Sequence, residues 1–312
     1  MQTYEFDTVI LGGGPAGFSA GLYAARGAVS TAIVDINMLG GQPSNYLELE
    51  NYPGLCKIAG YELMEKFEEH AGMFGVEKFP MQEIESVDLI SNPKVITTKE
   101  AIFKAKTVII ATGAKSMKLG VPGEEEFIGR GVSYCAVCDG AFYRDKVVAV
   151  VGGGNSAVEE AMYLTKFASK VYLIHRRNEL RADKIVQERA FKNEKLEFIW
   201  DSVVTEIKGD DTVKSAVLNN VKTGEKKELE INGIFPYIGI TPNVENFSGQ
   251  LEQDKAGFII TDETMKTSID GVFAIGDVRK TPLRQVITAA ADGAVGAVYA
   301  VKYIEALKEV TV

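Results

Sequence analysis

The chain has 312 residues, a formal net charge of −9, 46% hydrophobic residues and 25% charged residues. Its length exceeds what one hydrophobic core usually serves, so we expect two domains, and its composition excludes a disordered or fibrous protein. The acidic balance argues against a surface built for nucleic acid or for an anionic membrane. Three cysteines, no secretory leader and no long apolar run together predict a cytoplasmic protein.

The first 40 residues predict a strand, a glycine turn, a helix and a second strand. Residues 6–11 (FDTVIL) are rich in β-formers, and residues 12–17 (GGGPAG) interrupt them. Residues 18–27 are small and apolar as in a packed helix, and residues 31–35 (TAIVD) form the next strand.

Three glycines in this turn match the pattern G-x-G-x-x-G. Gly12 allows a tight turn, Gly14 lets a pyrophosphate approach the backbone, and Gly17 lets the helix pack on the strand. Asp35 ends the following strand roughly 20 residues on, where a ribose-binding carboxylate belongs. This context predicts dinucleotide binding rather than a plain strand-turn-helix.

Residues 146–177 predict a second unit of the same kind. Its loop carries Gly152, Gly154 and Ala157, again between a strand and a helix. Two such units far apart in the chain predict two domains of one α/β architecture, each a Rossmann-like fold.

The second unit differs from the first at the end of its second strand. Where the first has Asp35, the second has His175, Arg176 and Arg177, with Arg181 shortly afterwards. A carboxylate would repel a 2′-phosphate, whereas guanidinium groups bind it. The second fold is therefore predicted to bind NADPH rather than NADH; a solvated basic face is the alternative.

A β-meander is predicted after each unit. The strands are residues 83–90, 94–100 and 101–113 in the first meander, and residues 203–209, 211–220 and 226–239 in the second. Pro236 removes a ladder hydrogen bond and therefore predicts an edge position or a strand start for its segment.

The C-terminal part carries no third glycine pattern. Residues 271–278 (GVFAIGDV) predict a short buried strand, and residues 285–307 predict a packed helix. The first domain lacks a final strand and helix, so we expect an insertion, with ATGA (111–114) and GITPN (239–243) as adjacent linkers. The predicted domains are residues 1–114 with 245–312, and residues 115–244.

Cys135 and Cys138 form a C-x-x-C pair. A zinc site would need further ligands nearby, but the remaining cysteine and the two histidines are scattered: Cys56, His70 and His175. A structural disulfide closing so short a loop would stabilise the fold little, and two inert thiols are a further alternative. A catalytic dithiol is the favoured interpretation, because this spacing allows a reversible bond.

Two neighbours of this pair complete the interpretation. Asp139 could move the proton that thiolate exchange requires, or it could simply be a turn residue before Gly140. Cys56 has no partner in the sequence and is predicted to be a small buried residue.

Together, these features resemble the low-molecular-weight thioredoxin reductases, FAD enzymes that pass electrons from NADPH to thioredoxin. The resemblance covers nearly the full length. It is carried by GGGPAG (12–17), GGQ (40–42), ENYPG (50–54), ATGA (111–114), CAVCDG (135–140), GGGNSAVEEA (152–161), HRRNELRA (175–182), GITPN (239–243), GVFAIGDV (271–278) and RQVITAAADG (284–293).

The resemblance implies that the first fold holds FAD, with Asp277 at the ribityl-phosphate region, and that the second holds NADPH. The implied FAD residues are Gly12, Gly14, Pro15, Ala16, Gly17, Asp35, Gly41, Gln42, Asn51, Ala111, Thr112, Gly113, Gly276, Asp277, Arg284 and Gln285. The implied NADPH residues are Gly152, Gly154, Asn155, Ser156, Ala157, His175, Arg176, Arg177 and Arg181.

The resemblance also implies roles for the dithiol. Cys138 is expected to face the flavin, Cys135 to attack thioredoxin, and Asp139 to act as the acid-base residue. A homodimer is implied as well. Since the dithiol and the NADPH loop belong to one domain and must reach the same flavin in the other, the inserted domain is expected to rotate about the linkers.

Two other functions share part of this pattern. A related flavoprotein could take electrons from ferredoxin or serve another protein disulfide, although a ferredoxin-fed relative is expected to lack an intact NADPH site. An NADPH-sensing binding protein would need neither the dithiol nor the FAD motifs. The chain departs from many relatives near Met117, where an arginine is frequent and Lys115 and Lys118 stand nearby, so we assign no function to that position.

Overall fold

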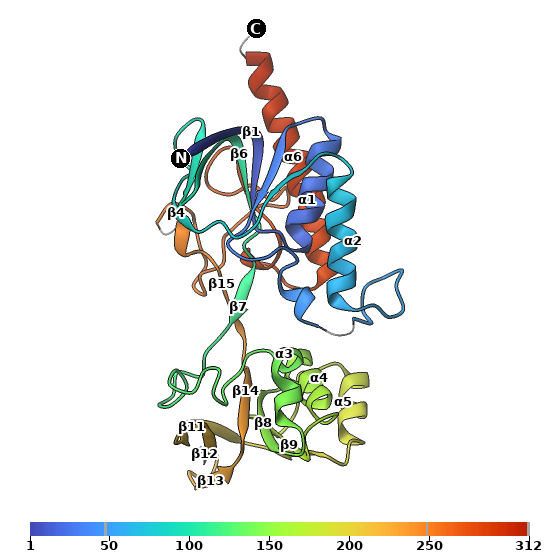
Figure 1. Cartoon of the computed structure of the whole chain (residues 1–312), viewed down its shortest axis with the longest axis vertical. Helices are drawn as coiled ribbons and strands as arrows, with labels where there is room; N and C mark the ends of the chain where they lie inside the picture. Colours follow the sequence, from blue (N-terminus) through green and yellow to red (C-terminus); the bar gives the residue numbers. More distant parts are fainter. Residues whose placement is uncertain (47–48, 248, 311–312) are drawn as a thin grey trace. The chain divides into compact units, whose positions relative to one another are not determined.

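The computed structural model describes residues 1–46, 49–247 and 249–310. The chain forms two compact units, Met1–Lys115 with Thr241–Val312, and Ser116–Ile240. One unit is inserted into the other, as the sequence predicts (Figure 1). The first crossing between the units falls one residue after the predicted boundary at 114, and the second falls four residues before the predicted boundary at 244.

A mixed seven-stranded sheet forms the centre of the first unit. Its order is β3-β2-β1-β6-β5-β4, and β16 pairs with the remaining part of β6. The pairs along β3-β2-β1-β6 and β6-β16 are parallel, and those along β6-β5-β4 are antiparallel. The strands are β1 Gln2–Leu11, β2 Thr31–Val34, β3 Glu77–Phe79, β4 Ile84–Asp88, β5 Lys94–Thr98, β6 Ala101–Ile110 and β16 Val272–Ala274.

Three helices accompany this sheet: α1 Pro15–Arg26, α2 Gly60–Gly72 and α6 Val286–Val310. They run side by side in Figure 1, and buried residues of α1 and α6 share a core with the sheet. β16 and α6 are the final strand and helix that the first half of the chain lacks. The prediction that the C-terminal segment completes the first domain is therefore confirmed.

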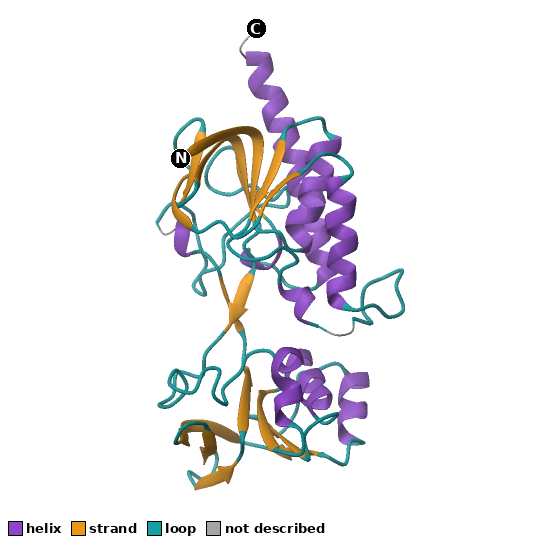
Figure 2. Cartoon of the chain, viewed as in Figure 1, coloured by secondary structure: helices purple, strands orange, loops and turns teal. Residues whose placement is uncertain are grey.

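The second unit repeats the strand-loop-helix-strand order in a smaller form (Figure 2). A parallel sheet has the order β10-β9-β8-β14, and a separate antiparallel sheet has the order β11-β12-β13. Its elements are α3 Ala136–Asp139, β8 Val147–Gly152, α4 Asn155–Leu164, β9 Lys170–Ile174, α5 Lys184–Phe191, β10 Leu196–Ile199, β11 Ser202–Gly209, β12 Val213–Asn220, β13 Lys226–Glu230 and β14 Gly233–Tyr237.

The two units differ where each meander meets its parallel sheet. In the first unit, β6 is continuous, pairing with β5 along its first half and with β16 along its second. The prediction of one strand over 226–239 is wrong, because the chain breaks at Ile231 and Asn232 into β13 and β14, which belong to different sheets. β14 is the terminal strand of its sheet, which confirms the edge position predicted from Pro236.

The two linkers are hydrogen-bonded to each other. β7 (Ala114–Ser116) and β15 (Ile240–Pro242) form a two-stranded sheet. On one side of this pair the amide of Asn243 donates to the carbonyl of Gly113, and on the other the amide of Met117 donates to that of Gly239. The chain thus leaves and re-enters the first unit at one place.

None of the helices in the described part of the chain combines the length and the apolar character that a membrane span requires.

Candidate active site and nucleotide loops

The first glycine loop, residues 12–17, connects β1 to α1 and is closed by backbone contacts. Gly12 has φ of +113°, and a Cβ atom there would lie 2.3 Å from the carbonyl oxygen of Ala111. A Cβ on Gly17 would lie 1.9 Å from the carbonyl oxygen of Gly12. Only glycine fits these positions, because the chain segments approach one another at backbone distance.

Three other predicted segments meet at this loop. A Cβ on Gly41 would lie 3.0 Å from the Cα of Gly14, and a Cβ on Gly276 would lie 3.0 Å from the Cβ of Ala16. Ala111 is already in contact through Gly12. The structure therefore brings the GGQ, ATGA and GDV segments to the predicted FAD loop.

Asp35 lies directly after β2 and closes the same loop. Its carboxylate accepts the backbone N–H of Gly13 at 2.6 Å and that of Asn37 at 2.8 Å. Burial raises the pKa of this carboxyl, and the two N–H groups oppose the rise by stabilising the charged form. The structure thus gives Asp35 a loop-closing role in addition to the predicted contact with a ribose.

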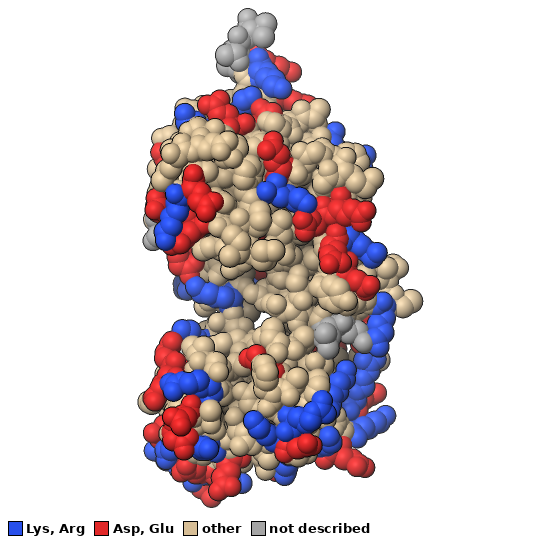
Figure 3. Space-filling model, viewed as in Figure 1, with Lys and Arg blue, Asp and Glu red and all other residues tan. Residues whose placement is uncertain are grey.

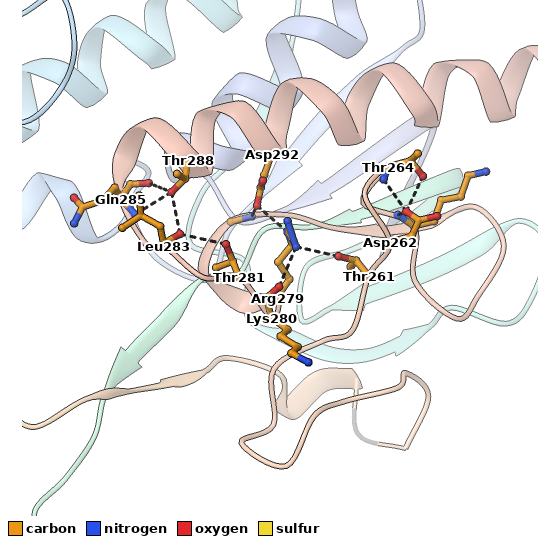
Figure 4. Close-up of polar contacts among 12 residues, drawn as sticks. Thr261, Asp262, Thr264, Arg279, Lys280, Thr281, Leu283, Gln285, Thr288 and Asp292 are labelled. Carbon is orange, nitrogen blue, oxygen red and sulfur yellow. Dashed lines mark hydrogen bonds and ion pairs between the residues drawn. The ribbon is translucent and has the colours of Figure 1, made fainter.

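An ion pair fixes the turn Gly276–Val278 to α6 (Figure 4). Asp292 on α6 accepts the N–H of Gly276 at 3.1 Å and Nε of Arg279 at 2.9 Å. Arg279 also donates to the hydroxyl of Thr261 at 3.2 Å. Sequence reasoning missed this pair, although a lone carboxylate in the small, apolar run AAADG was a signal that a cation lies nearby.

Asp277 lies within this turn. Burial raises the pKa of its carboxyl, while the positive charge of Arg284 lowers it and the negative charge of Asp292 raises it again. The guanidinium of Arg284 lies 4.0 Å from the ring centre of Phe258, and its Nε is buried without a hydrogen-bond partner. A buried donor left unpaired beside the carboxyl of Asp277 fits a ligand that offers hydrogen-bond acceptors.

The remaining predicted FAD residues have separate positions. Asn51 donates to Oε1 of Gln285 at 3.1 Å, which joins the ENYPG segment to the start of α6. Thr112 donates its hydroxyl to the carbonyl of Asn243 at 2.7 Å and thereby fixes the linker. Pro15 begins α1, and Gln42 is an exposed side chain.

The second glycine loop lies between β8 and α4. A Cβ on Gly152 would lie 2.4 Å from the carbonyl oxygen of Tyr237 and 2.6 Å from the Cβ of Ala157. A Cβ on Gly154, by contrast, would have no neighbouring heavy atom within 4 Å. The side chain of Asn155 donates to Asp183 at 2.7 Å and ties the loop to the start of α5, while Ser156 is exposed.

His175 lies under the second loop. A Cβ on Gly153 would lie 2.4 to 2.6 Å from three atoms of its imidazole ring, so the ring packs on that glycine. Nε2 is buried without a partner. Burial lowers the pKa of His175, and the charges of Arg181, Arg176 and Arg177 lower it further. A neutral His175 therefore packs against the second glycine loop at Gly153.

The three predicted arginines surround this histidine. Residues 175–183 do not form a helix; they follow the loop, and the amide of Arg181 donates to the carbonyl of Gly153 at 2.7 Å. All three arginine side chains are exposed. Figure 3 shows Lys and Arg side chains gathered along the side of this unit on which α5 lies. The cluster is open to an anionic ligand at the glycine loop.

The C-x-x-C pair lies at the start of α3, with Cys135 immediately before the helix and Cys138 within it. Cys135 and Cys138 form a disulfide bond, and the amide of Cys138 donates to Sγ of Cys135 at 3.1 Å. In this oxidised form Cys138 is exposed and Cys135 is half-buried. Asp139 ends α3, and its charge adds to burial in raising the pKa of the Tyr143 hydroxyl.

The prediction that Cys56 is buried is wrong, because its side chain is exposed. It lies in the irregular segment after Pro53 and Gly54, and such loops run over the surface with side chains directed outward. Within the described part of the chain, no three His, Cys, Asp or Glu side chains come together as a metal-binding group.

The lysines near Met117 are already paired. Lys115 forms an ion pair with Glu245, and Lys118 forms one with Glu125 at 2.5 Å.

Glu160 on α4 is a further group that sequence reasoning missed. It is 5% exposed, and its Oε2 has no hydrogen-bond partner.

Two dinucleotide-type glycine loops and a C-x-x-C disulfide define a nucleotide-dependent disulfide oxidoreductase. Residues 6–293 match the family model described as pyridine nucleotide-disulphide oxidoreductase. A thioredoxin reductase from Peptoclostridium acidaminophilum is 52% identical over 308 residues, covering 96% of this chain and 98% of that protein.

Two solved structures complete the comparison. The Lactococcus lactis thioredoxin reductase is 50% identical, with 96% of this chain and 99% of that chain covered and a TM-score of 0.94. The Streptococcus pyogenes thioredoxin reductase is also 50% identical, with 97% and 99% covered and a TM-score of 0.62. The chain belongs to the pyridine nucleotide-disulphide oxidoreductases and, within them, to the thioredoxin reductase family. Membership implies a flavin and a nicotinamide nucleotide as cofactors.

Proposed function

We propose that this protein uses NADPH to reduce the disulfide of thioredoxin, by way of FAD and the Cys135–Cys138 pair. The observation that carries the proposal is the Cys135–Cys138 disulfide, which lies in the same unit as a glycine loop bordered by three arginines. Reduction of thioredoxin itself is named for relatives that match nearly the whole chain.

The residues of the first loop would hold FAD. Its pyrophosphate would lie at Gly12–Gly17, and the unpaired Nε of Arg284 and the carboxyl of Asp277 would offer polar contacts beside it. When bound, FAD supplies a two-electron relay between the nicotinamide and the disulfide. The arginines at 176, 177 and 181 would bind the 2′-phosphate of NADPH.

The chain's own thiols carry out the exchange with thioredoxin. In the reduced protein, the Cys135 thiolate attacks one sulfur of the thioredoxin disulfide, forming a mixed disulfide and releasing a thioredoxin thiolate. Cys138 then attacks Sγ of Cys135, which restores the Cys135–Cys138 bond and releases the second thioredoxin thiol. Thioredoxin gains two electrons and two protons, and Asp139, which directly follows Cys138 in α3, would transfer a proton in this exchange.

A rotation of the inserted unit would let the disulfide and the nicotinamide take turns at the flavin. Two relatives of equal identity to this chain have TM-scores of 0.94 and 0.62, so those two structures differ in three-dimensional arrangement. The paired linkers β7 and β15 are the natural hinge, because hinges lie at element ends. Two results together would exclude rotation. The scattering curves of the oxidised and the NADPH-reduced protein would be the same, and one crystal form would show the nicotinamide and the disulfide at the flavin together.

The function is tested by anaerobic mixing of FAD-loaded protein with NADPH or NADH, followed by oxidised thioredoxin. We expect NADPH to bleach the flavin absorbance, and thioredoxin to restore it with the appearance of two thiols per thioredoxin. Bleaching by reduced ferredoxin but not by NADPH would favour the ferredoxin-fed alternative. Bleaching by NADPH without any thioredoxin thiols would favour another protein disulfide as the acceptor.

We also propose that the protein is cytoplasmic and forms a homodimer. Sedimentation of the purified protein would test the oligomeric state.

A further inference from the structure

The segment that carries the dithiol is attached to the outer edge of β14. The amide of Ile234 donates to the carbonyl of Gly131 at 2.8 Å, and the amide of Ser133 donates to the carbonyl of Ile234 at 3.1 Å. The hydroxyl of Ser133 in turn accepts the amide of Cys135 at 3.1 Å. The backbone leading into the C-x-x-C pair therefore follows β14.

Tyr237, the last residue of β14, continues this attachment into α3. Its hydroxyl accepts the backbone N–H of Ala136 at 3.0 Å. Ala136 is fully buried and is the first residue of α3, so its N–H has no acceptor within the helix. The phenol oxygen satisfies this donor, which would otherwise be a buried group without a partner.

The position of Ala136 determines the geometry at the sulfurs. Cys135 immediately precedes α3, and the amide of Cys138 at the far side of the same turn donates to its Sγ at 3.1 Å. A hydrogen bond to sulfur favours the thiolate over the thiol once the disulfide is reduced. A turn that shifts at Ala136 would lose the alignment of this donor with Cys135.

The same tyrosine also contacts the nucleotide loop. Tyr237 pairs in register with Gly152, and its carbonyl oxygen occupies the space that a Cβ of Gly152 would need. After Tyr237, only Ile238 and Gly239 separate β14 from the linker strand β15. One residue thus contacts the dithiol turn and the glycine loop and lies next to the linker.

We propose that Tyr237 is a positioning residue for the dithiol, whose hydroxyl holds the 135–138 turn in the geometry that makes Cys135 reactive. The inference rests on the proposed dithiol chemistry. Sequence reasoning could not have found it, because the tyrosine and the turn are about 100 residues apart and meet only through the pairing of β14.

The test is the Tyr237→Phe variant, which keeps the ring and removes the hydroxyl that accepts the N–H of Ala136. The protein is reduced with dithiothreitol, which is itself oxidised to its cyclic disulfide, and freed of the reagent without oxygen. The rate at which iodoacetamide alkylates Cys135 is then followed by mass spectrometry from pH 5 to 9. We expect the rate at pH 7 to fall roughly three- to tenfold, the effect of losing one hydrogen bond, and the midpoint of the pH profile to rise.

The second readout is the midpoint potential of the Cys135–Cys138 couple, measured by equilibration with glutathione buffers. We expect a shift in Tyr237→Phe and none in Tyr172→Phe, a matched change on β9 of the same unit. An unchanged pH profile and potential in Tyr237→Phe, or equal shifts in both variants, would overturn the assignment. Neither measurement uses thioredoxin or a nucleotide, so a wrong choice of substrate or donor would leave these results unaffected.

Discussion

Nε of Arg279 lies 2.9 Å from Oδ2 of Asp292, and the same oxygen accepts the backbone N–H of Gly276. Both side chains are largely buried, at 14% and 13% exposed. One carboxylate oxygen therefore joins α6, the turn that carries Asp277 and the segment that follows it. Because two partners depend on this oxygen, its loss should affect both the stability of the first unit and the shape of its nucleotide site.

We expect Asp292→Asn to lower the free energy of unfolding by about 1–3 kcal/mol, because Arg279 would remain buried without a counter-charge. FAD should dissociate faster, since the turn at Gly276 loses its anchor. Thermal unfolding and the fluorescence of released flavin on dilution measure the two effects. Asp262→Asn is the control, because Asp262 caps an exposed turn shown in the same view (Figure 4). Equal behaviour of the two variants would contradict the anchoring role.

Replacing Arg176 and Arg177 with alanine should weaken NADPH more than NADH. Each charge-assisted hydrogen bond to a 2′-phosphate contributes about 1.5–3 kcal/mol, so we expect KM for NADPH to rise roughly 10- to 100-fold with little change for NADH. Steady-state kinetics with both nucleotides provide the ratio. Lys192→Ala, an exposed cation just after α5, should leave the ratio unchanged. An equal loss with both nucleotides would show that the arginines support the fold and not the phosphate.

Replacing either cysteine should separate flavin reduction by NADPH from thioredoxin reduction. In Cys138→Ser, NADPH should still bleach the flavin, but thioredoxin reduction should fall to background because the reducible disulfide is absent. Cys135→Ser should behave in the same way toward thioredoxin. Stopped-flow absorbance follows the first step and thiol titration the second. Substantial thioredoxin reduction by Cys138→Ser would refute the assigned chemistry.

Glu160 should make the second unit more stable in mild acid than in mild base. Burial raises the pKa of this carboxyl to about 7, and the negative charge of Glu159 adds to the shift. The folded state then binds a proton that the unfolded state releases near its ordinary pKa of 4.5. The stability associated with this proton is complete below about pH 4.5 and is lost as the pH rises through about 7.

The Glu160→Gln variant should remove this dependence. The quantity to compare is the free energy of unfolding of the variant minus that of the wild-type protein. We expect this difference to rise by on the order of 1–3 kcal/mol between pH 5 and pH 8. Denaturant unfolding at the two pH values measures the difference. Glu159→Gln, on the exposed side of the same helix, should show a much smaller effect. Parallel pH curves for wild type and Glu160→Gln would contradict the explanation.

The sequence predicts the fold best where the signal is local. The glycine loops at 12–17 and 152–157 each lie between a strand and a helix, and short runs of β-forming apolar residues locate the neighbouring strands. The insertion is predictable too, because the C-terminal strand and helix have no glycine loop of their own and need an existing sheet.

Features that depend on distant contacts could not be predicted. Whether residues 226–239 form one strand or two depends on which sheet each half joins, and the residues of this segment do not identify those sheets. The exposure of Cys56 depends on the path of an irregular loop. Tyr237 and Arg279 acquire their roles from partners brought close only by tertiary packing.

The adjacency of β7 and β15 has an evolutionary consequence. A segment whose two ends emerge side by side can be added to a gene for an existing protein without separating any strands of the host sheet. The host sheet is complete without residues 116–240, since β16 pairs directly with β6. The repeated strand-loop-helix-strand order in the two units is what the insertion of one such unit into another would produce.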